Sequence, residues 1–176
     1  MYVKFENKES MLAVGYLIPL KDDGPIDIKE SGAYWQGADF SSVNPEEYAK
    51  VAGTNNEVGL WIHTEDSEEQ VFFYGPVVEN FDFVPEGLAT LLIPAAEYAV
   101  FTTKPVNLKT DFLSYADTIR ACWRDIFSDW VINQTEYEID EEKYCFELYS
   151  SKGEDYDIES ATVNIFVPIK NLRSNV

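Results

Sequence analysis

The stretch Ile119–Trp130 reads IRACWRDIFSDW, and it decides how the second half of the chain folds. Its apolar residues recur every three or four positions, which is the stripe of an amphipathic helix. Ser114 followed by Asp117 predicts a capping box at the start of this helix. Upstream, Gly87–Thr103 (GLATLLIPAAEYAVFTT) predicts a long strand interrupted at Pro94. Downstream, Lys143–Tyr149 (KYCFELY) and Thr162–Lys170 (TVNIFVPIK) predict two more strands around an acidic turn, Gly153–Glu159.

The first half repeats this order with different residues. Met11–Leu20 is a continuous apolar run that predicts a buried strand. Asn44 can cap a short helix, with Pro45 in its first turn and Gly53 as its stop. Val58–Thr64 and Gln70–Val78 then predict a hairpin joined by the charged turn Glu65–Glu69. Between the first strand and the helix, Tyr34, Trp35 and Phe40 suggest a lid or wall.

The sequence therefore predicts an α+β fold built from a tandem βαββ repeat with pseudo-twofold symmetry. We expect an antiparallel sheet with two main helices on one face and a central groove, where a ligand would bind. The repeats would span about 1–84 and 85–176 of a single domain, 1–176.

Composition excludes several classes of function. The 13 Lys and Arg against 32 Asp and Glu give a net charge of −19, which disfavours direct nucleic-acid binding and attracts cations. One histidine and two distant cysteines, Cys122 and Cys145, give no metal motif and favour reduced thiols, and we expect no cofactor. The charged N-terminus lacks a signal-peptide pattern, and no apolar run could span a membrane, so a cytoplasmic location is expected.

Four segments together resemble a known family: Ile93–Thr103, Ile119–Trp130, Tyr144–Tyr149 and Asn164–Lys170. In this order and spacing they look like the GyrI-like small-molecule-binding domain, the effector-binding domain of AraC-type and MerR-type transcription regulators. The resemblance implies a bacterial drug or effector sensor with an aromatic pocket that contains an acidic residue and takes lipophilic cations. One branch of the family resembles gyrase inhibitors, and another is reported as hydrolases of strained rings that use a Tyr and a Glu. The two repeats use nearly all 176 residues, so we expect a stand-alone module with no DNA-binding domain.

Glu147 is the main candidate for the acidic residue. Side chains alternate faces along a strand, so Phe146 and Leu148 would point to the core with Tyr144, and Glu147 would point away with Cys145 and Tyr149. The resemblance implies that an acid on this strand contacts the bound cation. The alternative is that this face is open to solvent and Glu147 is a surface charge.

Six aromatic residues are candidates for the pocket wall: Trp61, Tyr74, Tyr98, Phe101, Trp123 and Tyr149. Gly59 lies on the same side of its strand as Trp61 and would leave room for a ligand. Trp123 also fits the helix–sheet core, and Trp130 is assigned to that core. A catalytic pair of His63 with either cysteine would need a proximity that the sequence does not indicate.

Three functions remain open. The first is a non-enzymatic binding module for amphipathic, cationic small molecules, in sensing or sequestration. The second is a small-molecule hydrolase with Glu147 as general base and Tyr98 or Tyr149 as its partner. The third is an acidic module that binds a protein such as gyrase or a regulator, and the chain could be a monomer or a dimer.

Overall fold

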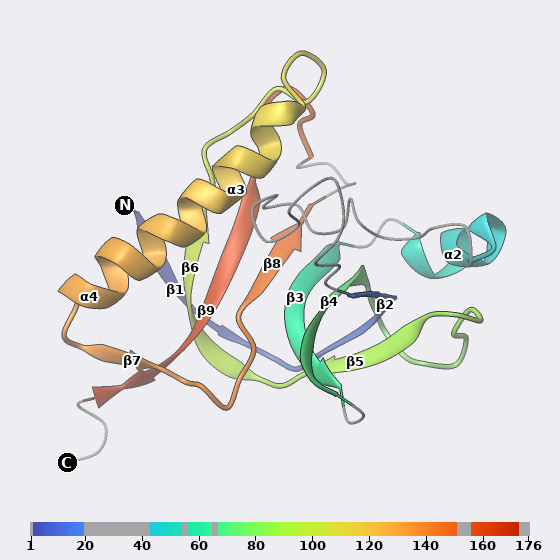
Figure 1. The fold of residues 1–176 in the computed structure, drawn as a ribbon, viewed down its shortest axis with the longest axis horizontal. Helices are drawn as coiled ribbons and strands as arrows, with labels where there is room; N and C mark the ends of the chain where they lie inside the picture. Colours follow the sequence, from blue (N-terminus) through green and yellow to red (C-terminus); the bar gives the residue numbers. More distant parts are fainter. Residues whose placement is uncertain (1, 20–42, 54–55, 65–66, 151–155, 173–176) are drawn as a thin grey trace.

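The computed structural model describes residues 2–19, 43–53, 56–64, 67–150 and 156–172 (Figure 1). The first part contains β1 (Val3–Lys8), β2 (Met11–Pro19), α2 (Pro45–Ala52), β3 (Glu57–Thr64) and β4 (Ser67–Val78). The second part contains β5 (Ala89–Ile93), β6 (Ala96–Thr102), α3 (Leu113–Asp125), a π-helical turn (Ile126–Trp130), α4 (Val131–Asn133), β7 (Tyr137–Ile139), β8 (Phe146–Tyr149) and β9 (Val163–Asn171). The expected aromatic lid lies outside the described residues.

The nine strands form one sheet in the order β1-β6-β9-β8-β3-β4-β2-β5, with β7 paired to β9. The order is symmetric about the central pair β8–β3, because β9 and β6 follow on one side as β4 and β2 do on the other. Every pairing is antiparallel. The predicted α+β class, with an antiparallel sheet and two main helices, is confirmed.

The two halves exchange their leading strands. β1 pairs with β6, whereas β5 pairs with β2. The two pairings continue one antiparallel register. Val3 faces Phe101, and Met11, eight residues later, faces Ile93, which is eight residues before Phe101. The predicted interruption at Pro94 is confirmed, and it divides the expected strand Gly87–Thr103 into β5 and β6. Proline cannot donate a ladder hydrogen bond, so the ladder breaks here and resumes in the same register.

The short helix α2 begins as predicted. The Asn44 side chain accepts a hydrogen bond from the Glu46 amide at 2.9 Å, and Pro45 opens the first turn. Gly53 closes the helix with φ at 49°, a left-handed backbone that favours glycine.

The predicted capping box of α3 is wrong. The cap residue is Phe112, whose backbone is already helical, and no side chain caps the helix. The chain enters through a backbone turn in which the Asp111 amide donates to the Asn107 carbonyl and the Tyr115 amide donates to the Phe112 carbonyl. Ser114 therefore lies inside the first turn, where its side chain is not needed as a cap.

Both helices pack on the same face of the sheet. One apolar cluster contains Tyr115 and Ile119 of α3 together with Tyr74 and Tyr149 of the central strands, and Tyr48 of α2 packs against it. A second cluster on the opposite face draws residues from β2, β3, β4, β5, β6, β8 and β9. The central strands are therefore buried on both faces.

Some strand ends differ from the expectation. β4 begins at Ser67, inside the expected charged turn, and residues 65–66 lie outside the described part. β8 begins at Phe146, because Lys143 instead closes a turn through its amide to the Asp140 carbonyl at 3.0 Å. The residues just before β8 therefore do not pair with the neighbouring strands β3 and β9, and they form part of the site described next.

Candidate functional site

The central strands β3 and β8 separate after three paired residues. Glu57 faces Tyr149, Val58 faces Leu148 and Gly59 faces Glu147, and no further pair joins the two described strands. Beyond Gly59 the strands diverge, and a pocket of about 660 Å³ opens in the fork. Its walls come from β3, β4, the chain before β8, the β5–β6 junction and α3. The lining residues are Gly59, Leu60, Trp61, His63, Phe72, Leu92, Pro94, Arg120, Trp123, Phe127, Glu141, Glu142, Lys143, Tyr144, Cys145 and Glu147.

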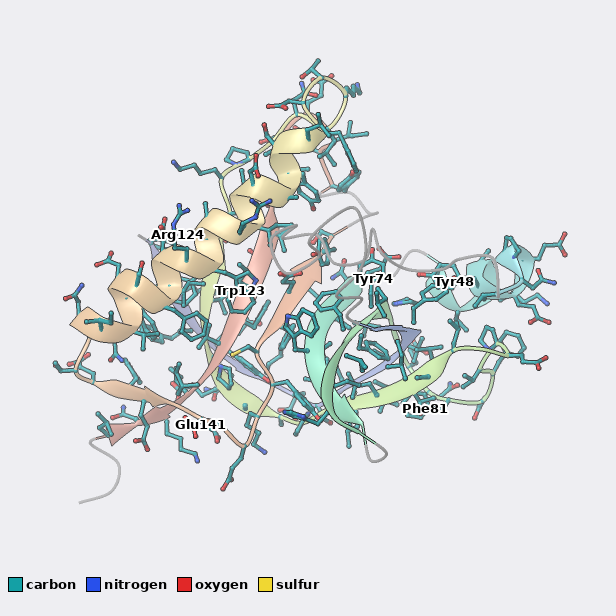
Figure 2. All side chains as sticks on the ribbon, in the orientation of Figure 1. Tyr48, Tyr74, Phe81, Trp123, Arg124 and Glu141 are labelled. Carbon is teal, nitrogen blue, oxygen red and sulfur yellow. The ribbon has the colours of Figure 1, made fainter. Side chains whose placement is uncertain are left out.

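Glu147 lies at the base of this fork and is almost completely buried, with 1% of its surface exposed. The indole Nε1 of Trp123 donates a hydrogen bond to its Oε1 at 2.6 Å. The Tyr149 hydroxyl donates to its Oε2 at 2.5 Å. Figure 2 shows Trp123 lying between α3 and the sheet, in the position that this bond requires. The surface-charge alternative for Glu147 is wrong.

Burial raises the pKa of Glu147 to about 7, because the ionised carboxylate loses its solvation. The hydrogen bonds from Tyr149 and Trp123 act in the opposite direction, since they stabilise the charged form. Burial next to this carboxylate also raises the pKa of Tyr149, so its phenol stays protonated at neutral pH. The site therefore holds an acid that can ionise near neutrality, with two aromatic donors to support its charge.

The space at Gly59 is already filled by the protein. A Cβ added there would lie 2.8 Å from Cζ of Phe72 and 3.3 Å from Oε2 of Glu147. The expectation that Gly59 leaves room for a ligand is met in part: Gly59 lines the pocket, but the Phe72 ring and the Glu147 carboxylate occupy the space where its side chain would lie. Its lack of a side chain allows these two groups to meet at the base of the pocket.

Two pairs of aromatic rings form the apolar walls. Trp61 and Phe72 are opposed on β3 and β4 and meet edge-to-face, with centroids 5.2 Å apart. Trp123 and Phe127 are stacked on the helix side, with centroids 6.0 Å apart. Aromatic pairs of this kind present ring faces and edges that suit apolar and cationic groups.

The seven predicted site residues fall into three groups. Glu147, Trp61 and Trp123 line the pocket. Tyr149 and Tyr74 lie behind it in the helix-face core, 5.7 Å apart between ring centroids. Tyr74 donates to Glu57, which also accepts from Tyr48 at 3.3 Å, and Figure 2 shows both tyrosines on the α2 side.

Tyr98 and Phe101 lie elsewhere, which corrects their placement in the pocket wall. Tyr98 packs on the opposite face of the sheet, against Phe146 and Phe166. Phe101 shares the helix face but belongs to β6, two strands from β8, where it packs on Trp130 at 5.0 Å. The expected core position of Trp130 is therefore confirmed.

Among the lining residues that sequence reasoning missed are Phe72, Phe127 and Lys143. Phe127 carried a signal, since it follows Trp123 by one helical turn. Phe72 carried a weaker one, because adjacent Phe72 and Phe73 both fit a buried strand and neither face could be preferred. Lys143 carried no signal, because the pattern of Lys143–Tyr149 predicts a strand that begins at this residue.

The two thiols do not favour nucleophilic chemistry. Burial raises the pKa of Cys145, which lines the pocket, to about 11. Burial likewise raises the pKa of Cys122, in the core beneath α3, to about 11. Thiolates are therefore scarce at neutral pH, and this argues against a nucleophilic cysteine activated by His63. Within the described ranges, no group of three or more His, Cys, Asp or Glu could hold a metal ion.

The fold and the pocket in the fork between the central strands define an effector-binding domain of the GyrI-like type. The integron-associated effector binding protein family (Cass2) matches residues 4–169, and the chain belongs to this family. A search of curated proteins finds no match. No helix in the described ranges is long and apolar enough to cross a membrane.

Solved structures share the fold at low sequence identity. The structure of SAV2435 bound to tetraphenylphosphonium has a TM-score of 0.63 and 16% identity, over 99% of this chain and 98% of that chain. The C-terminal domain of EcmrR has a TM-score of 0.58 and 13% identity, over 97% and 98% of the two chains. An integron cassette protein from Vibrio cholerae has a TM-score of 0.51 and 11% identity, over 96% and 95%.

Proposed function

We propose that the fork pocket binds lipophilic organic cations, with Glu147 as the counter-charge and the two aromatic pairs as walls. The observation that carries this proposal is the burial of Glu147 inside an aromatic-walled pocket. A buried carboxylate without a cationic partner is unfavourable, and its raised pKa reflects this cost. The tetraphenylphosphonium bound by SAV2435 is a ligand of this class in a protein of the same fold.

The physical account joins two contributions. A cation that enters the pocket stabilises the ionised form of Glu147 and removes the cost of an unpaired buried charge. Each well-placed ring adds cation–π attraction on the order of 0.5–2 kcal/mol. A ligand without a diffuse positive charge gains neither, so the pocket should discriminate by charge as well as by hydrophobicity.

The test is a calorimetric titration with tetraphenylphosphonium at about pH 8, where Glu147 is ionised. We expect saturable binding by the wild type and a loss of at least about tenfold in affinity for Glu147→Gln. Glu141→Gln is the matched control, because Glu141 is an exposed residue of the same pocket lining and the change in net charge is identical. No binding by the wild type, or equal losses in both variants, would reject the proposal.

A hydrolytic function is the second candidate, favoured by the 2.5 Å contact between Tyr149 and Glu147. In this version Glu147 acts as general base and the protonated Tyr149 phenol supports its charge. Tyr98 cannot serve, since it packs on the other face of the sheet. Turnover of an electrophilic small molecule that is lost in Glu147→Gln, and is retained in Tyr98→Phe, would establish this alternative.

Binding to gyrase or to a separate regulator, an AraC-type context and a cytoplasmic location stay predictions. An unchanged gyrase supercoiling assay in excess protein would remove the gyrase version.

A further inference from the structure

The rim of the pocket contains a cation that has no carboxylate of the described residues in contact. Lys143 lines the pocket and is half-buried. Among the described residues, the ammonium of Lys143 forms no ion pair and covers no aromatic ring. The described basic residues that do have such a partner are Lys4, Lys8, Lys50, Lys109, Arg120, Arg124 and Lys170.

The lack of an ion pair at Lys143 is notable because carboxylates are abundant in the chain, with 32 acidic against 13 basic residues. Lys104 is the other described basic residue without such a partner, and it is exposed to solvent. The nearby carboxylate of Asp140 forms its ion pair with Lys170, with Nζ 2.9 Å from Oδ1, and Lys143 attracts this carboxylate only from a longer distance. Within the described part of the chain, the half-buried ammonium of Lys143 has no carboxylate in contact, so an anion brought by a ligand would be favoured there.

Lys143 and Glu147 both line the pocket, come from the same stretch of chain and have opposite charges. They are four positions apart in the sequence, so their Cα atoms are at most ~14 Å apart. Glu147 lies in the fork at the end of the β3–β8 ladder, and Lys143 lies on the chain before the strand. A second basic residue, Arg120, lines the pocket one turn before Trp123 on α3, although it pairs with Asp117 at 3.2 Å. The rim also carries Glu141 and Glu142, which are both exposed and therefore strongly screened by water.

We propose that the pocket prefers zwitterionic aromatic ligands, which place a delocalised cation against Glu147 and a carboxylate or similar anion against Lys143. This inference rests on the proposed function and specifies its ligand class. A ligand with only a positive charge would satisfy Glu147 and leave Lys143 unpaired. A zwitterion would satisfy both and would bring no net charge.

The test compares rhodamine B, a zwitterion, with rhodamine B ethyl ester, which has the same chromophore but is only cationic. Fluorescence titrations at about pH 8 and low ionic strength avoid protonation of Glu147 and limit screening. We expect the acid to bind wild type more tightly than the ester does. Lys143→Gln should weaken binding of the acid by about three- to tenfold and leave the ester unchanged or slightly tighter.

Lys104→Gln is the matched control. It removes the same charge from another unpaired lysine, so it reproduces the change in the long-range field without touching the pocket. Lys143→Arg should retain the preference for the acid, which separates a charge effect from a packing effect.

The outcomes separate the two proposals. Equal or weaker binding of the acid by wild type, or equal effects of Lys143→Gln on both dyes, would overturn the zwitterion preference while the cation pocket stands. If neither dye binds and tetraphenylphosphonium does not bind either, both proposals fail together. A preference for the acid that disappears in Lys143→Gln but persists in Lys104→Gln would support the inference.

Discussion

Glu57 and Glu147 are equivalent positions of the two halves of the molecule. Each lies one residue before the central pair Val58–Leu148, and each accepts a hydrogen bond from an aromatic side chain on the helix of its own half. Tyr48 Oη lies 3.3 Å from Glu57, and Trp123 Nε1 lies 2.6 Å from Glu147. The equivalence is imperfect, since Glu147 is fully buried and Glu57 is half-buried. The symmetric fold therefore provides two acids, of which one is placed in the fork pocket.

This asymmetry predicts that the two glutamates contribute differently to ligand binding. Glu57→Gln should change the affinity for tetraphenylphosphonium by less than about twofold, because Glu57 does not line the pocket. The parallel titration of Glu147→Gln supplies the comparison. A loss in Glu57→Gln as large as that in Glu147→Gln would show that both acids contact the ligand.

Cation binding should depend on pH through Glu147. With a pKa of about 7 in the free protein, the ionised fraction falls about tenfold per pH unit below that value, and the apparent affinity falls with it. Affinity should therefore rise from about pH 5.5 to a plateau above about pH 8. Titrations across this range would measure the profile, and a flat profile would contradict an ionising anchor.

Stability should show the opposite trend with pH. The native state holds the Glu147 proton up to a pKa of about 7, whereas the unfolded chain releases it near 4.5. Between these values the native state binds more protons, so the free energy of unfolding falls as pH rises, by up to about 3 kcal/mol from this residue. Urea denaturation would measure the free energy of unfolding of wild type and of Glu147→Gln across this range. Relative to wild type, the variant should become more stable as the pH rises from about 4.5 to about 8. A difference independent of pH would contradict the raised pKa.

Trp123→Phe isolates one donor of the site. The substitution keeps an aromatic wall but removes the Nε1–H that supports the ionised Glu147, and this raises the pKa of Glu147 further. The midpoint of the binding–pH profile should move to higher pH, with affinity partly recovered at alkaline pH. Trp130→Phe is the control, since Trp130 packs on Phe101 away from the pocket and should leave the midpoint unchanged.

Gly59→Ala should disturb the base of the pocket. The new Cβ would lie 2.8 Å from the Phe72 ring, and overpacking of this kind costs typically about 1–3 kcal/mol. We expect a lower midpoint of denaturation and weaker cation binding. Adding Phe72→Leu removes the colliding ring atom, so the double variant should lose less stability than the two single effects added together. If the stability losses of the two single variants simply add in the double variant, the contact between the new Cβ and the Phe72 ring is not the cause of the loss.

The fold was predictable where local patterns agree with the tertiary structure. The helical stripe Ile119–Trp130 and the strands around Pro94 are predicted correctly, because most of their apolar residues lie on the faces that these elements bury. Glu147 was found because a charge in an apolar strand is conspicuous.

The pocket walls were harder to predict, for a physical reason. The central sheet is buried on both faces, so alternation does not show whether Tyr98 or Phe72 faces the helices. The fork between β3 and β8 arises where a ladder stops, and no local signal marks that point. Phe101 was misplaced because lateral strand order, which puts it two strands from β8, is invisible in the sequence.

The exchange of leading strands has a consequence for how the chain folds. Val3 must find Phe101 across almost a hundred residues before β1 has any neighbour, and β5 depends on the distant β2 in the same way. Such long-range pairings give a high contact order and slow, cooperative folding. A fragment that ends near residue 84 would leave β1 unpaired and one edge of β2 open. The two repeats are thus symmetric in architecture but do not form separate folding units, and the pocket between them can form only when the whole sheet has assembled.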